Sequence, residues 1–319
     1  MQQHLHIDFE TFCELDLKQV GLYKYMEHES FEPLMMSYAF DNEPTQIIDF
    51  CKGEQIPTRV LAALKDPNII KHAHNVPFEQ ECFKQMGLPQ DLRQWQCSMV
   101  KCAYMGIPLS LEEAGDALEL KIRKDKRGKE LIKLFCTLQK GNKTRSNFRV
   151  YWFDNPEAWE VFKQYCIFDT DVEREIDHRL QYFVIPDRER VLYLIDRDIN
   201  TRGIEIDTSF AINAYKLDCM YKDKLAKEVY QRTGVNPKSE KQFIEWLQAN
   251  MPDAPANCQK KVIEEVLKKR KNDLSPMVKY MLEVRLQVTK TSNKKYDAMV
   301  KSQQTDKMVR NTLQFYGAN

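Results

Sequence analysis

Seven residues near the start of the chain, HLHIDFE at positions 4–10, alternate strictly between polar and apolar side chains. Such alternation predicts a β-strand, because successive side chains of a strand point to opposite faces. The apolar face of this strand carries Leu5, Ile7 and Phe9. Asp8 and Glu10 project together from the other face, about 6.5–7 Å apart along the strand. The segment therefore predicts a strand that packs one face on a core and presents two carboxylates on the other.

The pattern after this strand predicts an α/β domain. Further strands are predicted at residues 34–40 and 45–50. A helix predicted at 59–65 leads into a short strand at 68–74, and from Pro77 onward the pattern is mostly helical. Strands that alternate with helices are typical of a sheet covered by helices.

Two local signals indicate where helices start. Ser110 and Glu113 have the spacing of a capping box. Asn155 followed by Pro156 combines a cap residue with a first-turn proline, which predicts a helix that continues to about residue 183.

Pro186 marks the expected domain boundary, with an α/β domain at 1–185 and a helical region at 186–319. The helices predicted in the second region cover 190–202, 209–232, 239–251 and 262–299, the last in pieces broken near Pro276. A length of 319 residues suits two domains better than one.

Composition excludes several classes of protein. Hydrophobic residues make up 43% of the chain, which is enough for a packed core. No apolar run approaches the ~20 residues that span a bilayer, and the acidic residues near the N-terminus are incompatible with a secretory signal peptide. The nine cysteines include no Cys-x-x-Cys pair, so reduced thiols are expected. We expect a cytoplasmic protein without a membrane partner, located in the bacterial host cytoplasm if a phage or prophage encodes it.

The charge is unevenly distributed along the chain. Residues 1–185 have a net charge of −6 and residues 186–319 a net charge of +7. This division suits a polyanionic partner beside a cation-binding site, although two solvated halves would give the same balance. Six of the nine residues at 121–129 are basic, and this run either contacts phosphates or forms a solvated loop.

Three short motifs carry the candidate chemistry. The first is the Asp8-x-Glu10 pair, and oxygen ligands of this kind suit Mg²⁺ or Mn²⁺. The second is the stretch from Asn75 to Glu79, which directly follows a predicted strand. The third pairs Tyr165 with Asp169 on one face of a helix. Each motif alone has an ordinary explanation: an exposed strand face, a first-turn glutamate or a helix surface pair.

In combination, these motifs resemble the proofreading domain of family A DNA polymerases, most closely the bacteriophage-type members. Their order is Asp-x-Glu, then Asn-x-x-Phe-Glu about 65 residues later, then Tyr-x-x-x-Asp about 90 residues further on. The wider group is the DEDD exonucleases, whose RNase H-like fold has a mixed sheet flanked by helices. Tyr165, with Gln164 in place of a histidine, indicates the tyrosine subclass.

The resemblance implies a 3′→5′ exonuclease that uses two divalent cations, Mg²⁺ or Mn²⁺. Asp8, Glu10 and Asp169 would hold one ion, and Asp8 would share the second with the scissile phosphate. Glu79 would support the second ion, and Tyr165 would orient the attacking water. The residues expected to bind the terminal nucleotide are Thr11, Asn75 and Phe78.

One position departs from the family pattern. The acid of the second motif is usually aspartate, and here it is Glu79. Its extra methylene moves the carboxylate outward by about one bond length, which metal support through water could absorb more readily than direct coordination could. The rate is therefore in question more than the type of reaction.

The second half of the chain also resembles these polymerases. Residues 198–207 are similar to the segment that leads from exonuclease into polymerase, and residues 284–296 to the thumb helix that grips duplex DNA. Lys290, Lys294 and Lys295 fall at helical spacings there and could contact phosphates, although a solvated amphipathic helix would show the same pattern.

In the relatives, the sequence QFYGA lies just before the palm, and here it begins at residue 314. We therefore expect an exonuclease with a partial thumb, without the palm and fingers needed for polymerisation. The expected partners are a single-stranded 3′ end, a primer–template duplex and a separately encoded palm and fingers chain. Two alternatives remain: a weakly active DNA-holding subunit that serves such a palm, and an exonuclease that trims RNA 3′ ends.

Overall fold

The computed structural model describes residues 3–120, 128–141, 146–270 and 272–316. The chain forms two compact units. The sheet unit comprises Met1–Glu205 and Ser302–Asn319, and the helical unit is Ile206–Lys301. The chain thus divides at different points from the boundary expected after residue 185.

Helix α9 (Asp187–Arg202) belongs to the sheet unit because its side chains are bonded into that unit. Arg197 Nη2 donates to Tyr23 Oη at 3.0 Å. Asn200 Nδ2 donates to the carbonyl of Leu313 at 3.0 Å, and Leu313 N donates back to Asn200 Oδ1 at 2.8 Å. These bonds attach both the helix and the last described segment to the sheet unit.

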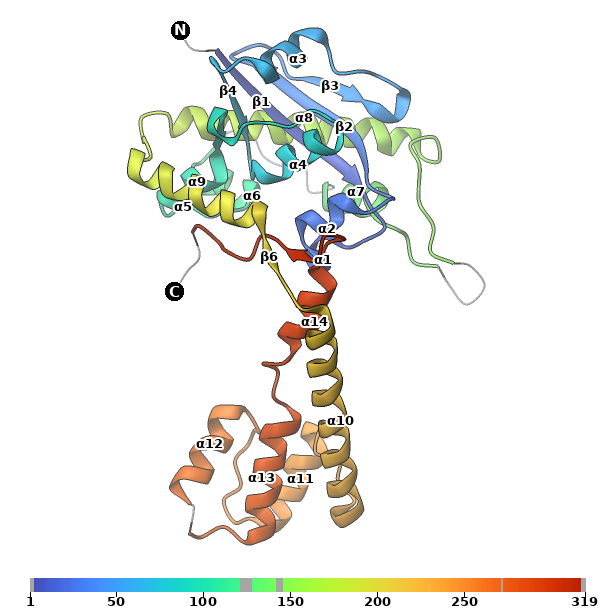
Figure 1. Cartoon of the computed structure of the whole chain (residues 1–319), viewed down its shortest axis with the longest axis vertical. Coiled ribbons are helices and arrows are strands. Elements are labelled where there is room, and N and C mark those ends of the chain that lie inside the picture. Colours follow the sequence, from blue (N-terminus) through green and yellow to red (C-terminus); the bar gives the residue numbers. More distant parts are fainter. Residues whose placement is uncertain (1–2, 121–127, 142–145, 271, 317–319) are drawn as a thin grey trace. The chain divides into compact units, whose positions relative to one another are not determined.

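A five-stranded mixed sheet forms the framework of the sheet unit (Figure 1), with strand order β3-β2-β1-β4-β5. β1 pairs antiparallel with β2, β2 antiparallel with β3, and β4 parallel with both β1 and β5. The strands are β1 (Gln3–Phe12), β2 (Glu32–Phe40), β3 (Gln46–Asp49), β4 (Ile69–Ala73) and β5 (Trp95–Cys97). The expected α/β fold, a mixed sheet flanked by helices, is confirmed. The three-residue strand β5 was not predicted.

The central strand β1 has two different faces, as its alternation predicts. Leu5, Ile7 and Phe9 are buried in one core cluster with Val60 of α3 and Phe83 of α4. The polar face is covered by α8 (Pro156–Arg179), a helix of 24 residues that runs across the sheet (Figure 1). β1 therefore lies between two layers of helices, with its polar side chains directed at α8.

Both predicted helix starts are confirmed. Glu113 N donates to Ser110 Oγ at the start of α6, and Ala158 N donates to Asn155 Oδ1 at the start of α8, each at 3.2 Å. The remaining helices of the sheet unit are α1 (Leu17–Val20), α2 (Leu22–Glu27), α3 (Thr58–Lys65), α4 (Pro77–Gln85), α5 (Ser98–Tyr104), α6 (Leu111–Ala117) and α7 (Gly128–Phe135), with 3-10 turns η1 (Phe50–Lys52) and η2 (Leu92–Gln94). A short pair of strands, β6 (Ile204–Glu205) and β7 (Met308–Val309), completes the unit.

The helical unit has its own hydrophobic core, which includes Val229, Phe243, Ile263 and Leu282. Its helices are α10 (Thr208–Thr233), α11 (Glu240–Asn250), α12 (Lys260–Lys269), α13 (Pro276–Val288) and α14 (Lys294–Ser302). An all-helical region was expected here, and the helix starts agree with the sequence pattern.

The helix expected over residues 284–296 is not continuous, and this expectation was wrong. α13 ends at Val288 and α14 begins at Lys294, so Lys290 lies in the connection between them. Thr289 Oγ1 donates to the carbonyl of Arg285, and Asn293 Nδ2 donates to Asp218 Oδ1 at 2.7 Å. Threonine, serine and asparagine side chains compete with helical backbone bonds in this way, which ends the helix.

Three further expectations concern the whole chain. All nine cysteines are free thiols. Among the described residues, no helix combines the length and apolarity that a membrane span requires. Of the basic run at 121–129, residues 121–127 lie outside the described residues.

Candidate active site and metal centre

The first two acids of the site come from the polar face of β1. Asp8 is half-buried opposite Ser37 of β2, and Glu10 is 8% exposed. The β1–β2 register shifts between Glu10 and Thr11, directly after the second acid. The period of two along the strand therefore aims both carboxylates at the helix that covers this face.

Helix α8 brings the third acid to the same place. Ser37 Oγ donates to the carbonyl of Cys166 at 2.8 Å and lies 2.6 Å from Thr170 Oγ1, which fixes α8 against β2. Carboxylate oxygens of Asp8, Glu10 and Asp169 all lie within 4.8 Å of one another. We call these three residues the acid cluster.

Glu79 adds a fourth carboxylate from the first turn of α4. The loop before this helix contains Asn75 with φ 77°, and Pro77 begins the helix. Glu79 is 2% exposed, and its Oε2 has no hydrogen-bond partner among the described residues. Burial raises the pKa of Glu79 well above its ordinary value, and the charge of Asp8 raises it further. Glu79 is thus electrostatically coupled to Asp8, but it is not one of the three residues whose carboxylate oxygens lie within 4.8 Å of one another.

Two thiols contact the acid cluster. Cys136 Sγ donates to Glu10 Oε2 and Cys166 Sγ donates to Asp8 Oδ2, each at 3.7 Å. Burial and the neighbouring carboxylates raise the pKa of both thiols, so they remain protonated donors. Sequence reasoning missed both residues. Cys166 lies within the third motif and could have been found there, whereas nothing in the local pattern singles out Cys136.

Tyr165 lies beside Asp169, as their spacing of four predicts. Burial raises the pKa of Tyr165 far above its ordinary value, and Asp169 and Glu10 add to the shift. The phenol therefore keeps its proton and donates a hydrogen bond to Asp169. Its ring packs against the first residue of α7, because a Cβ built on Gly128 would lie only 2.0 Å from Tyr165 Cε2.

A comparison of the whole sequence identifies a relative. A DNA polymerase of Bacillus phage SP02 is 39% identical over 323 residues, covering 99% of this chain and 48% of the phage protein. Over almost its whole length, the chain is homologous to this bacteriophage DNA polymerase. It spans about half the length of this relative. No protein-family model matches the chain.

A solved structure resembles the chain in fold. The polymerase domain of Pol1 from M. smegmatis, solved with a DNA primer-template and dNTP, matches with a TM-score of 0.56 and 13% identity. That match covers 97% of this chain and 48% of the other. NrnC of Brucella melitensis matches with a TM-score of 0.35 and 14% identity, over 56% of this chain and 74% of NrnC.

The residues expected to bind the terminal nucleotide are only partly brought together in the structure. Asn75 and Phe78 are both half-buried and line one pocket of about 460 Å³, which Phe315 and Tyr316 also line. Thr11 is buried elsewhere, with its Oγ1 2.9 Å from Tyr25 Oη. The side chains of Lys290, Lys294 and Lys295 are all exposed on the helical unit.

Proposed function

We propose that this chain hydrolyses DNA from the 3′ end with the help of two divalent cations. The observation that carries the proposal is the convergence of Asp8, Glu10 and Asp169 within 4.8 Å, from a strand and a helix about 160 residues apart. Glu79 supports it, because a buried glutamate that senses the charge of Asp8 is unfavourable in its ionised form without a cation.

The donor set fits Mg²⁺ or Mn²⁺. All four side chains offer carboxylate oxygens, which are the ligands that hard divalent cations prefer. Asp8, Glu10 and Asp169 would hold the cations, with Glu79 as a supporting ligand whose Oε2 is free of hydrogen bonds from the described residues. Bound cations would neutralise the crowded carboxylates and make both a water molecule and the scissile phosphate more reactive.

The neighbouring groups would orient the reactants. Tyr165 retains its proton, which it donates to Asp169 in this structure; with a cation on Asp169, the hydroxyl would donate instead to a water molecule or phosphate oxygen at the edge of the acid cluster. Asn75 and Phe78 would contact the terminal nucleotide, since they line one pocket next to the helix that carries Glu79. Thr11 would act through Tyr25, to which its hydroxyl is bonded, rather than by direct contact with the nucleotide.

DNA is the proposed substrate because the chain is homologous to a phage DNA polymerase. The exposed lysines Lys290, Lys294 and Lys295 would contact backbone phosphates of a primer–template duplex. A partner that supplies a palm and fingers, encoded on the same or a separate chain, would complete the polymerase.

Degradation of a 5′-labelled single strand of DNA tests the proposal. With Mg²⁺ or Mn²⁺ the strand should shorten stepwise from its 3′ end, and EDTA should stop the reaction. Asp8→Ala should lower the rate by about a hundredfold or more, because it removes a ligand of the proposed cations, which would stabilise the negative charge of the transition state. Glu14→Ala, which removes an exposed acid nearby, should leave the rate unchanged. If Asp8→Ala digests the strand as fast as Glu14→Ala, the site assignment is wrong, and a preference for a matched RNA strand would reassign the substrate.

A further inference from the structure

The polar contacts between β1 and α8 continue beyond the acid cluster. On β1, His4 and His6 precede Asp8 on the same face, at intervals of two residues. On α8, Glu173 and Asp177 follow Asp169 at intervals of four, so they lie on the same face of the helix. The two elements therefore bring histidines and acids together at the end of β1 away from Glu10.

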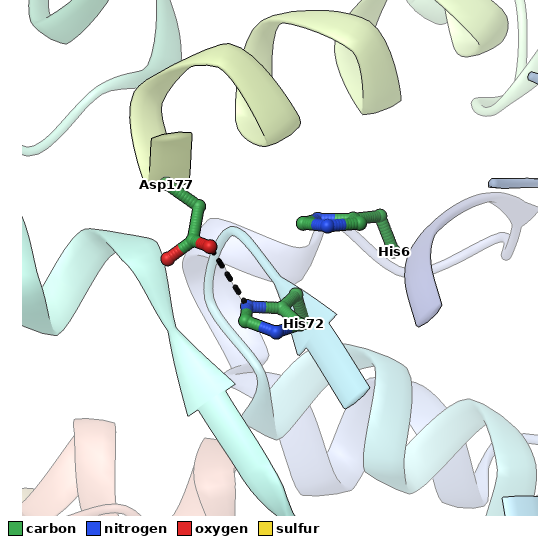
Figure 2. Close-up of side chains that lie close together, drawn as sticks. All are labelled: His6, His72 and Asp177. Atoms are coloured by element: carbon green, nitrogen blue, oxygen red, sulfur yellow. Dashed lines mark ion pairs between the residues drawn. The ribbon is translucent and has the colours of Figure 1, made fainter. Parts of the chain in front are cut away.

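Three side chains converge at this end: His6, His72 of β4 and Asp177 (Figure 2). His6 and His72 are register partners of neighbouring parallel strands, and their rings stack at 4.4 Å between centroids. His72 Nδ1 lies 3.6 Å from Asp177 Oδ2. One ligand atom from each of the three residues lies within 4.8 Å of the other two.

The hydrogen bonds of the two rings occupy one nitrogen of each, and binding of one cation by the other two nitrogens would require the stacked rings to turn toward a common point. His6 Nδ1 lies 2.6 Å from Glu173 Oε2, and when the neutral ring donates there, His6 Nε2 carries a lone pair. His72 Nε2 lies 2.8 Å from His4 Nδ1, and when it donates there, His72 Nδ1 carries a lone pair. At 3.6 Å, the separation of His72 Nδ1 and Asp177 Oδ2 is too long for a hydrogen bond.

We propose that His6, His72 and Asp177 bind a transition-metal cation of the Zn²⁺ type. Two imidazole nitrogens and one carboxylate oxygen are ligands that Zn²⁺ prefers, whereas Mg²⁺ prefers oxygen alone. A carboxylate that accepts from the second nitrogen of a metal-bound histidine is a common support for such a site, and Glu173 is placed to act in this way on His6.

The surroundings allow a cation to enter. His6 and Asp177 both line a surface pocket of about 1050 Å³, which His4 and His178 also line. Lys101 Nζ lies 3.3 Å from Asp177 Oδ1, which leaves Oδ2 directed at His72. Three protein ligands leave one position of a tetrahedral ion for water from the pocket.

A cation at this site would join β1 and β4 of the sheet to α8, the helix that carries Asp169. Binding to the folded chain alone would stabilise the fold in proportion to occupancy. This assignment does not depend on the proposed nuclease activity, because none of its three ligands belongs to the acid cluster.

Calorimetric titration of the metal-free full chain with Zn²⁺ tests the assignment. Excess Mg²⁺ is present throughout to occupy the acid cluster. The wild-type chain should bind one equivalent of Zn²⁺ and melt at a higher temperature in its presence. Asp177→Asn, which keeps the size and shape of a side chain that is 17% exposed, is expected to weaken binding at least about tenfold. His6→Gln should do the same if it folds.

Two control variants separate this site from other sources of binding. His178→Gln removes an exposed histidine that lines the same pocket, and it should leave Zn²⁺ affinity unchanged. Asp8→Ala disables the acid cluster, and the Zn²⁺ equivalent should persist. The proposal is overturned if Asp177→Asn binds Zn²⁺ as tightly as wild type, or if Asp8→Ala abolishes the binding.

Discussion

At the scale of single residues, the site is a group of like charges that the fold holds together. Carboxylate oxygens of Asp8, Glu10 and Asp169 lie within 4.8 Å of one another, and the buried Glu79 senses the charge of Asp8. The thiols of Cys166 and Cys136, which donate to Asp8 and Glu10, are weak hydrogen-bond donors. Such an arrangement is unfavourable without cations, so the site should measurably lower the free energy of unfolding in their absence.

In EDTA, Glu79→Gln should relieve part of this loss of stability. Because the folded-state pKa of Glu79 is raised, the folded chain binds its proton more tightly than the unfolded chain does. The free energy of unfolding should therefore fall as the pH rises above about 4.5, the ordinary value. Glutamine cannot ionise, so the variant should melt at a higher temperature than wild type at pH 7, with a difference that shrinks toward pH 4.5.

Thermal melts across this pH range provide the measurement. Mg²⁺ should stabilise wild type, so that its melting temperature becomes the higher of the two. Glu81→Gln on the same helix, which removes an ion pair with Lys84, serves as the control and should not melt higher than wild type. A Glu79→Gln variant less stable than wild type in EDTA at pH 7 would contradict the prediction.

At the scale of elements, β1 and α8 form both the acid cluster and the His6–His72–Asp177 group, because residues on the same face are spaced almost equally along the strand and the helix. Two residues of a strand advance about 6.6 Å, and four residues of a helix advance about 6 Å. Successive polar residues of β1 can therefore meet successive polar residues of α8. The acid cluster joins Asp8 to Asp169, and the next contact joins His6 to Glu173.

Helix α7 completes the site by covering Tyr165, which makes Gly128 a sensitive position. A methyl group there would lie 2.0 Å from the Tyr165 ring, so Gly128→Ala must displace the ring or the helix. We expect a DNA hydrolysis rate lower by about 10- to 100-fold, because small displacements of an orienting group reduce the rate strongly.

Gly115→Ala on α6 is the matched control, since its Cβ would meet Val172 at 3.7 Å, an ordinary contact. That variant should keep its rate and gain about 0.5–1 kcal/mol of stability from the removal of a helical glycine. Equal hydrolysis rates for the two variants would show that α7 does not position Tyr165.

At the scale of the whole molecule, each compact unit has its own core and its own proposed task. The sheet unit holds both candidate cation sites, and the helical unit carries the exposed lysines Lys290, Lys294 and Lys295. Lys290 lies in the connection after α13, and the other two begin α14. If these lysines contact phosphates, duplex binding and strand hydrolysis should respond to different substitutions.

Replacing Lys290, Lys294 and Lys295 together by alanine should weaken binding to a primer–template duplex. The slope of log affinity against log salt should become shallower by about 0.9 for each phosphate that a lysine no longer neutralises. Hydrolysis of a short single strand at saturating concentration should not change. The matched control replaces Lys260, Lys261 and Lys268, three exposed lysines of the same unit. Equal salt slopes for the two triple variants would exclude the three predicted lysines from the DNA interface.

Local pattern alone predicted β1, the starts of α6 and α8, and the placement of Tyr165 and Asp169 on one helix face. These features depend on neighbours a few residues apart, through strand and helix periodicity and through capping side chains. The break after Val288 was also local in origin, and the threonines, serine and asparagine that cause it are visible at 289–293.

The sequence by itself thus determined β1, the starts of α6 and α8, and which acids β1 and α8 present. Only the tertiary structure decided that Cys136 reaches Glu10, and that His72 joins His6 and Asp177. Those contacts join residues between about 65 and 170 positions apart, and strand order and helix packing bring them together rather than any local repeat. Helix α9 belongs to the sheet unit for the same reason, because it is hydrogen-bonded to Tyr23 and Leu313, which are more than 100 positions away in the sequence.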